Sequence, residues 1–120
     1  MADPDAIAPD GSEIRLLVTD AARASLVEVT LPAGAVSRPV RHRTVEEIWF
    51  FLAGEGQVWV AGQTTAVTAG SRIVIPAGAG FQFAAGAGAP LRFLCYTSPP
   101  WPGAQEAEAV AAGGLGPATV

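Results

Sequence analysis

The stretch that decides the fold is GAVSRPVRHRTVEEIWFFLAGEG, residues 34–56. It opens with turn-forming residues, continues into the apolar run of residues 46–53 and closes on Gly54 and Gly56. Aromatic and β-branched residues favour a strand, and glycine permits the positive φ that a tight turn needs. The stretch therefore predicts a strand over residues 46–53 that ends at a turn.

Short apolar runs of the same kind recur on both sides of this stretch. Turn residues such as Ala61-Gly62-Gln63 and Pro76 separate them, and no helical periodicity competes before residue 103. Strands at this spacing predict an all-β sandwich or barrel. They are expected at residues 13–19, 24–31, 46–53, 57–61, 65–68, 72–75, 81–84 and 91–97.

A second block, GSRIVIPAGAGFQF at residues 70–83, completes a resemblance to the two sequence motifs of the cupin superfamily. The resemblance covers residues 24–97 and implies a small antiparallel β-barrel, a jelly roll or double-stranded β-helix, with an interior pocket. The positions in register are Gly34, Val40, His42, Glu47 and Gly54 for the first motif, and Gly70, Pro76, Gly78, Phe81 and Ala85 for the second.

The resemblance also shows which metal ligands are missing. Metal-binding cupins use three histidines and one glutamate, and two of the histidine positions here hold Val40 and Phe81. A mononuclear divalent-metal site needs about three protein ligands, so the sequence predicts no metal and no other cofactor. If a divalent metal is bound, its ligands are His42 and Glu47, with Cys95 or Gln82 as an added donor.

His42 and Glu47 are five positions apart, which on an unbroken strand would put their side chains on opposite faces. Residues 43–45 must therefore contain a turn or bulge if the two side chains meet, whereas a straight strand would pair His42 with Glu46. The family pattern turns Glu47 inward, and we expect Glu46 to face solvent. An imidazole and a carboxylate in contact inside an apolar barrel form a catalytic acid–base pair. The alternative is a histidine at the rim that does no chemistry.

Apolar side chains predict the pocket lining, because small-ligand sites are mostly apolar with few polar groups. Alternation from Glu47 turns Trp49 and Phe51 inward, and plain core packing is the alternative for every aromatic residue. The arginines within residues 38–43 suit an anionic group, or else are solvated surface side chains. The predicted substrate-binding residues are Val40, Trp49, Phe51, Phe81, Phe83, Arg41 and Gln82.

The other face of the strand over residues 46–53 is apolar as well, because it carries Ile48, Phe50 and Leu52. Apolar residues on both faces of a strand require a second layer. In small cupins that layer is commonly the partner subunit, so we expect a homodimer.

The two ends of the chain differ from its centre. Residues 1–12 are acidic, contain prolines and show no apolar period, which predicts a flexible arm before a barrel over residues 13–97. Residues 98–120 form an extended tail whose prolines stiffen its first part, and we expect this strap to dock Trp101 on the outside of the barrel or over its mouth. Within the tail, residues 105–112 suit a short helix.

Length, charge and cysteine content exclude several classes of protein. A chain of 120 residues supports one domain, and no window approaches the roughly 20 apolar residues of a membrane span, so we expect no membrane partner. A net charge of −4 opposes nucleic-acid binding, and the lone Cys95 excludes an intrachain disulfide. The start lacks the features of a secretory signal, which predicts a cytoplasmic protein, and the Ala-, Gly- and Arg-rich composition without Lys fits a bacterial source.

Together these features favour an enzyme of isomerase, lyase or cyclase type. We expect metal-independent acid–base chemistry, meaning isomerisation, epimerisation, cyclisation or elimination, on a small anionic or aromatic metabolite. Two alternatives remain open: a cupin that binds a small ligand without catalysis, and a metal-dependent oxygenase or isomerase with a reduced ligand set.

Overall fold

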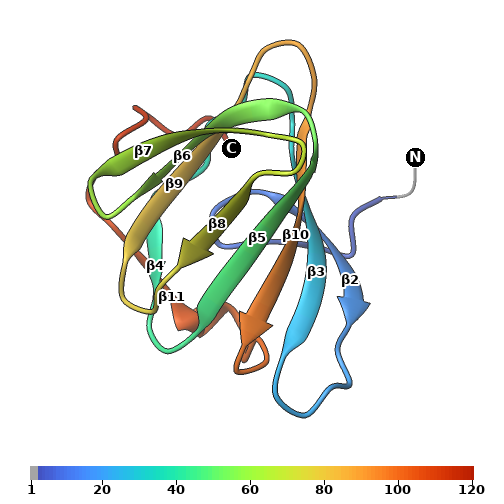
Figure 1. Ribbon diagram of the computed structural model, residues 1–120. Helices are drawn as coiled ribbons and strands as arrows, with labels where there is room; N and C mark the ends of the chain where they lie inside the picture. The colour runs from blue at the N-terminus through green and yellow to red at the C-terminus, as the bar shows by residue number, and fades with distance from the viewer. Residues whose placement is uncertain (1–2) are drawn as a thin grey trace.

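Two antiparallel sheets enclose an apolar core in the computed structural model, which describes residues 3–120 (Figure 1). One sheet has the strand order β1-β2-β3-β10-β5-β8 and the other has the order β11-β4-β9-β6-β7. The all-β barrel predicted from the sequence is thereby confirmed. The strands are β1 (Ala6–Ile7), β2 (Glu13–Val18), β3 (Ser25–Leu31), β4 (Val40–His42), β5 (Glu46–Ala53), β6 (Glu55–Val60), β7 (Gln63–Thr68), β8 (Arg72–Ile75), β9 (Gly80–Ala85), β10 (Leu91–Ser98) and β11 (Ala107–Ala109).

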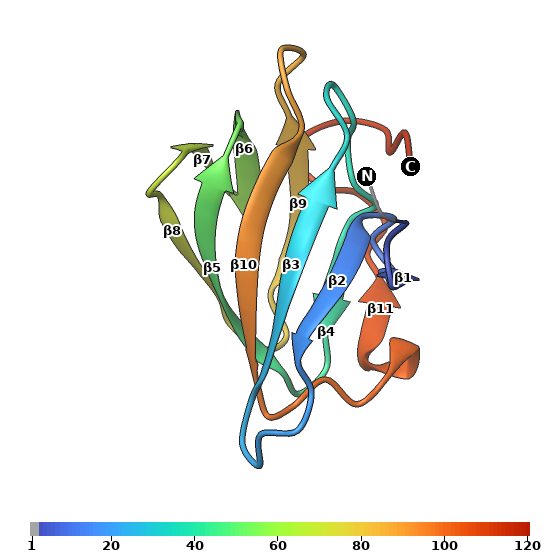
Figure 2. The ribbon, with the colours of Figure 1, turned by 90° about the vertical axis from the view of Figure 1, so that its right-hand side faces the viewer.

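The layers are visible from the side, where β2, β3, β10 and β5 run next to one another in front of β9 and β4 (Figure 2). All eight strands expected from apolar runs are present, and their ends lie within two residues of the predicted ones. Gly54 has a φ of 81° at the tight connection between β5 and β6, as the sequence suggested.

Three short strands were missed: β1, β4 and β11, each of two or three residues. A strand of two or three residues is too short to show alternation of apolar and polar side chains. It is a strand only because its backbone pairs with a neighbouring strand. The sequence wrongly predicted a helix over residues 105–112, where the chain forms a 3₁₀ turn (Ala104–Glu106) followed by β11, which pairs with β4. Pairing to an open sheet edge satisfies backbone groups that an isolated short helix would leave to water.

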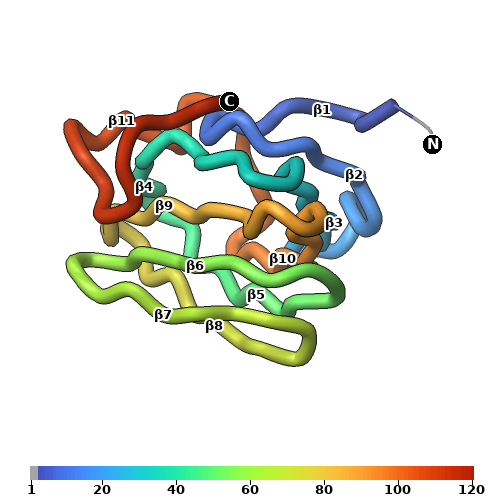
Figure 3. Tube along the Cα trace, turned by 90° about the horizontal axis from the view of Figure 1, so that it is seen from above, coloured from blue at the N-terminus to red at the C-terminus, as the bar shows by residue number. Residues whose placement is uncertain are grey.

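The N-terminal segment packs against the barrel over its described residues, 3–12. β1 pairs with β2, and Asp10 and Ser12 are buried, so this part of the predicted arm forms a wall of the molecule. From above, β1 and the C-terminal tail follow the same side of the barrel (Figure 3). Within the described residues, no helix is long and apolar enough to cross a membrane.

Candidate functional site

A cavity of about 390 Å³ lies within the barrel. Its wall comes from the N-terminal segment, from β2, β3, β4, β5 and β10, and from residues 100–104 of the strap. Most of this wall is apolar, and the few polar side chains that face it include His42, Glu47 and Asp10. An apolar cavity with a small number of polar groups has the composition of a small-molecule site.

His42 and Glu47 meet at this cavity, as the sequence predicted. β4 ends at His42, β5 begins at Glu46, and the connection over residues 43–45 lets the two side chains converge. His42 Nδ1 lies 3.4 Å from Glu47 Oε2, and each residue is only 5% exposed, whereas Glu46 faces solvent. The indole Nε1 of Trp49 donates a hydrogen bond of 2.8 Å to Glu47 Oε1, which fixes the orientation of the carboxyl group. The catalytic role of the pair stays a prediction.

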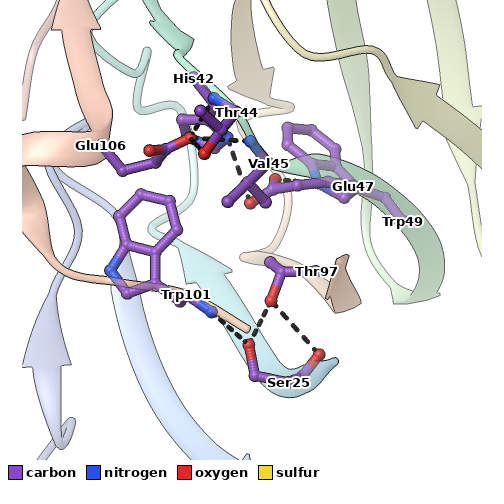
Figure 4. A network of polar contacts seen from close by, with 9 residues as sticks. All are labelled: Ser25, His42, Thr44, Val45, Glu47, Trp49, Thr97, Trp101 and Glu106. Atoms are coloured by element: carbon purple, nitrogen blue, oxygen red, sulfur yellow. Dashed lines mark hydrogen bonds and ion pairs between the residues drawn. The ribbon is translucent and has the colours of Figure 1, made fainter. Parts of the chain in front are cut away.

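Glu106, from the 3₁₀ turn, holds the connection that makes this contact possible (Figure 4). Its Oε1 accepts hydrogen bonds from the Thr44 amide, from the Thr44 hydroxyl at 2.8 Å and from the Val45 amide at 2.7 Å. Burial acts to raise the pKa of Glu106, but these hydrogen bonds and the nearby His42 outweigh it and hold the pKa below its usual value. No sequence pattern indicated this residue, because Glu106 is about 60 positions from the turn that it binds.

The His42 imidazole is held between two aromatic rings. It makes edge contacts with Phe81 at 5.0 Å and with Trp101 at 4.9 Å between ring centroids. The amide of Trp101 donates a hydrogen bond of 3.1 Å to the Ser25 hydroxyl, which also contacts the Thr97 hydroxyl (Figure 4). The strap therefore docks its indole at the cavity, one of the two places expected from the sequence.

Burial changes the protonation of the pair. It raises the pKa of Glu47 to about 7 and lowers the pKa of His42 to about 4. The Trp49 and Cys95 hydrogen bonds act against the shift of Glu47, and the charge of Glu106 acts against that of His42. At neutral pH the imidazole is thus uncharged, and Glu47 is divided between its acid and its carboxylate.

The predicted substrate-binding residues separate into two groups. Val40 and Trp49 line the cavity. Phe51, Phe81 and Phe83 are fully buried in the core beyond its wall, so the alternative of plain packing describes them better.

Gln82 and Arg41 lie away from the cavity. Strand alternation turns Gln82 opposite to Phe81, where its amide binds the backbone of Ser37 at 3.0 Å and of Leu115 and Gly116 at 2.8 Å each. Arg41 is an exposed side chain that pairs with Glu108 at 3.2 Å. Both assignments to substrate binding are corrected by these contacts.

Several polar residues of the wall were not predicted, namely Asp10, Ser12, Ser25 and Thr97. Asp10 and Ser12 lie in a segment without apolar period, so no pattern indicated their burial. Ser25 and Thr97 pair across β3 and β10, and their positions on the inner face follow from alternation alone.

The residues around His42 do not fit the metal site of the family resemblance. Val40 and Phe81, at the two substituted ligand positions, present hydrocarbon, and Phe81 packs its ring on the imidazole. Over residues 3–120 no group of three His, Cys, Asp or Glu side chains is arranged to hold a metal ion. Glu47 also engages Trp49 and the Cys95 thiol, which leaves its carboxyl group hydrogen-bonded within the protein.

Comparisons with known proteins agree with this fold. The family model described as "Cupin domain" matches residues 27–97. The polyketide cyclase RemF from Streptomyces resistomycificus is 25% identical, with 93% of this chain and 78% of RemF aligned at a TM-score of 0.72. No curated protein sequence matches the chain.

Two more distant structures share the fold. KdgF from a Halomonas species is 19% identical over 82% of this chain and 86% of its own, with a TM-score of 0.71. A Streptomyces Pac13 variant solved with uridine is 12% identical over 84% and 79%, also with a TM-score of 0.71, and Pac13 is described as a nucleoside dehydratase.

Proposed function

This chain belongs to the cupin family, and from that premise we propose that it is an enzyme acting on a small molecule by proton transfer. In this proposal His42 and Glu47 carry the proton, without a metal, in an isomerisation, cyclisation or elimination. The observation that carries it is the contact of 3.4 Å between these two buried groups at the wall of a mostly apolar cavity.

The pair has two protonation states that differ by one proton. When Glu47 is a carboxylate, its charge 3.4 Å from Nδ1 favours the tautomer of His42 with the proton on Nδ1, which leaves Nε2 as a base. When Glu47 is protonated, its acid proton faces Nδ1, and Nε2 carries a proton that the ring can give away. Because the pKa of Glu47 lies at about 7, both states are populated at neutral pH, which suits general acid–base catalysis.

Of the two substrate classes expected from the sequence, the residues that line the cavity favour an uncharged aromatic molecule over an anionic one. Trp49, Phe93 and Trp101 face the cavity, and no arginine does so among the described residues. An anion inside would meet the carboxyl groups of Asp10 and Glu47, and the cation that acts on Asp10, Arg38, does not line the cavity. The similarity to a polyketide cyclase supports the same choice, since that neighbour aligns with nearly the whole chain.

The test follows the exchange of an acidic C–H proton in a neutral aryl ketone. With 2-tetralone in D₂O, NMR measures deuterium uptake next to the carbonyl group, and tryptophan fluorescence measures binding. We expect the protein to accelerate uptake and His42→Ala or Glu47→Gln to lower the rate by about 10²-fold or more with binding retained. Glu46→Gln, on the exposed neighbour, is the matched control and should match the parent.

Two results would favour the alternatives. A parent protein that binds the ketone without accelerating uptake would point to a binding module. One tightly held metal ion per chain, whose removal by a chelator abolishes uptake, would point to a metal-dependent enzyme.

We also propose that a second copy of the chain covers the outer face of β5. Ile48 and Phe50 on that face are each 44% exposed, and Val74 and Tyr96 on the neighbouring strands are exposed as well. Sedimentation of the parent protein tests this homodimer. The bacterial source and cytoplasmic location stay predictions.

A further inference from the structure

We infer that Asp10, on the N-terminal segment, is a second proton-transfer residue of the cavity. The inference rests on the proposed function, because it adds a proton acceptor to a site in which His42 and Glu47 already handle protons. The family match covers residues 27–97, and Asp10 lies before it. The inference therefore gives the N-terminal segment a direct part in the chemistry.

Asp10 is placed in the cavity wall by several backbone contacts. The Arg38 amide donates to the Asp10 carbonyl at 2.8 Å, and the Ala8 amide donates to the Ser12 carbonyl at 2.9 Å. Asp10 is 8% exposed and lines the same cavity as His42 and Glu47. Asp10 is thus held on a structured turn in the wall of the cavity.

The hydrogen bonds of Asp10 fix one oxygen of its carboxyl group. Oδ1 accepts from the Ser12 amide at 2.9 Å and from the Ser12 hydroxyl at 2.6 Å. Donors of this kind stabilise a carboxylate and set its orientation. Burial of a charge in a mostly apolar wall is costly, and a neutral asparagine would accept the same two hydrogen bonds at lower cost. An aspartate at position 10, in place of an asparagine, is explained if its negative charge takes part in proton transfer.

The charged and titratable groups around Asp10 suit a base. Burial raises its pKa above the usual value, while the Ser12 hydrogen bonds and the charge of Arg38 act in the opposite direction. Across the cavity Asp10 in turn helps to raise the pKa of Glu47 and of Cys95. A carboxylate whose pKa is raised is a stronger base than one in water, and Glu47 beside it retains its proton more readily.

The two carboxyl groups then divide one enolisation between them. The Asp10 carboxylate takes the proton from the carbon next to the carbonyl group, and the C–H electron pair becomes the new C=C bond. His42 Nε2 gives its proton to the carbonyl oxygen, whose π electrons form the O–H bond, and Nδ1 takes up the acid proton of Glu47. Asp10 ends protonated and Glu47 ends as a carboxylate beside His42 Nδ1, so the substrate leaves as a neutral enol.

The experiment measures 2-tetralone exchange in Asp10→Asn and Asp10→Ala. We expect each to lose about 10²-fold in exchange rate with ketone binding unchanged within about 3-fold, and we expect added formate to restore part of the rate in Asp10→Ala only. The parent rate should rise with pH as Asp10 ionises and fall again as Glu47 loses its acid proton above about pH 7, and Asp10→Asn should lack the rise. Asp3→Asn, on an exposed residue of the same segment, should match the parent.

The formate rescue separates chemistry from structure, because a small carboxylate cannot repair a misfolded turn. Exchange within about 3-fold of the parent in Asp10→Asn, or a low rate in Asp10→Ala that formate leaves unchanged, would overturn the inference. If His42→Ala and Glu47→Gln lose exchange while the Asp10 variants do not, only this inference fails. If the parent itself does not accelerate exchange, the proposed function fails with it.

Discussion

The two halves of the barrel interior are built differently. In one half Phe51, Phe83 and Phe93 pack with Trp49 at ring-centroid distances of 4.3 to 6.3 Å and leave no access to solvent. The other half holds the cavity, with polar groups on its wall and the strap at its mouth. Trp49 and Phe93 belong to both, because their rings stack on each other and both line the cavity, where Trp49 Nε1 binds Glu47.

This difference shows how a small barrel both folds and keeps space for a ligand. The packed half buries enough aromatic surface to stabilise the fold, since each ring removes a large apolar area from water. The hollow half accepts buried polar groups whose unfavourable solvation shifts their pKa values. Stability and proton transfer are therefore expected to respond to different substitutions.

The largest effect on stability is expected in the packed half. Phe83→Ala should lower the free energy of unfolding by about 3–5 kcal/mol, because it leaves a cavity among fully buried rings. Val27→Ala, at the wall of the existing cavity, should cost about 1 kcal/mol or less. Urea denaturation measures both, and equal losses would contradict the division into two halves.

Glu106→Ala should have the next largest effect, and it should reach the site as well. The Glu106 carboxylate accepts hydrogen bonds from three donors in the connection over residues 43–45. Its loss should lower the free energy of unfolding by about 2–4 kcal/mol. Glu106→Gln keeps one acceptor and should lose less. Because the connection positions His42 against Glu47, the ketone exchange rate should fall more in Glu106→Ala than in Glu106→Gln. An unchanged exchange rate would show that the connection keeps its conformation without Glu106.

Glu47→Gln should stabilise the protein at high pH while it removes proton transfer. The pKa of Glu47 is raised to about 7, so ionisation in the folded state is unfavourable, and the folded form loses stability as the pH rises from 4.5 through 7. At pH 8 the variant should therefore be more stable than the parent by about 1–3 kcal/mol, and the gain should vanish near pH 4. A gain that is the same at both pH values would show that the ionisation of Glu47 is not its cause.

The smallest effect on the fold is expected on the outer face of β5. Ile48→Lys should change the free energy of unfolding of the monomer by about 0.5 kcal/mol or less, because the side chain is half exposed. The same change should dissociate the proposed homodimer, which sedimentation detects. Glu46→Lys, on the same outer face at the end of β5 but itself polar, is the comparison, and equal dissociation by both would argue against an interface centred on the apolar side chains.

The sequence predicted most of the fold because the barrel strands carry their own signal. Apolar runs bounded by glycine and proline located eight strands, and alternation turned Glu47, Trp49 and Phe51 inward. The contact of His42 with Glu47 followed from the family resemblance, which turns Glu47 inward, together with a break between the two strands. Short strands defined by their partners, such as β11, carried no comparable signal.

By itself, then, the sequence determined the barrel and the inward face of each long strand, because alternation along a strand is a local property, and its resemblance to the cupin motifs indicated the contact of His42 with Glu47. Only the tertiary structure decided which aromatic residues fill the barrel and which face the cavity. It alone brought Asp10 and Glu106 to the site from the two ends of the chain, and it decided between the two places expected for Trp101. These residues are distant in sequence, and their roles depend on chain closure and on the balance between burial and hydrogen bonding, which no local pattern records.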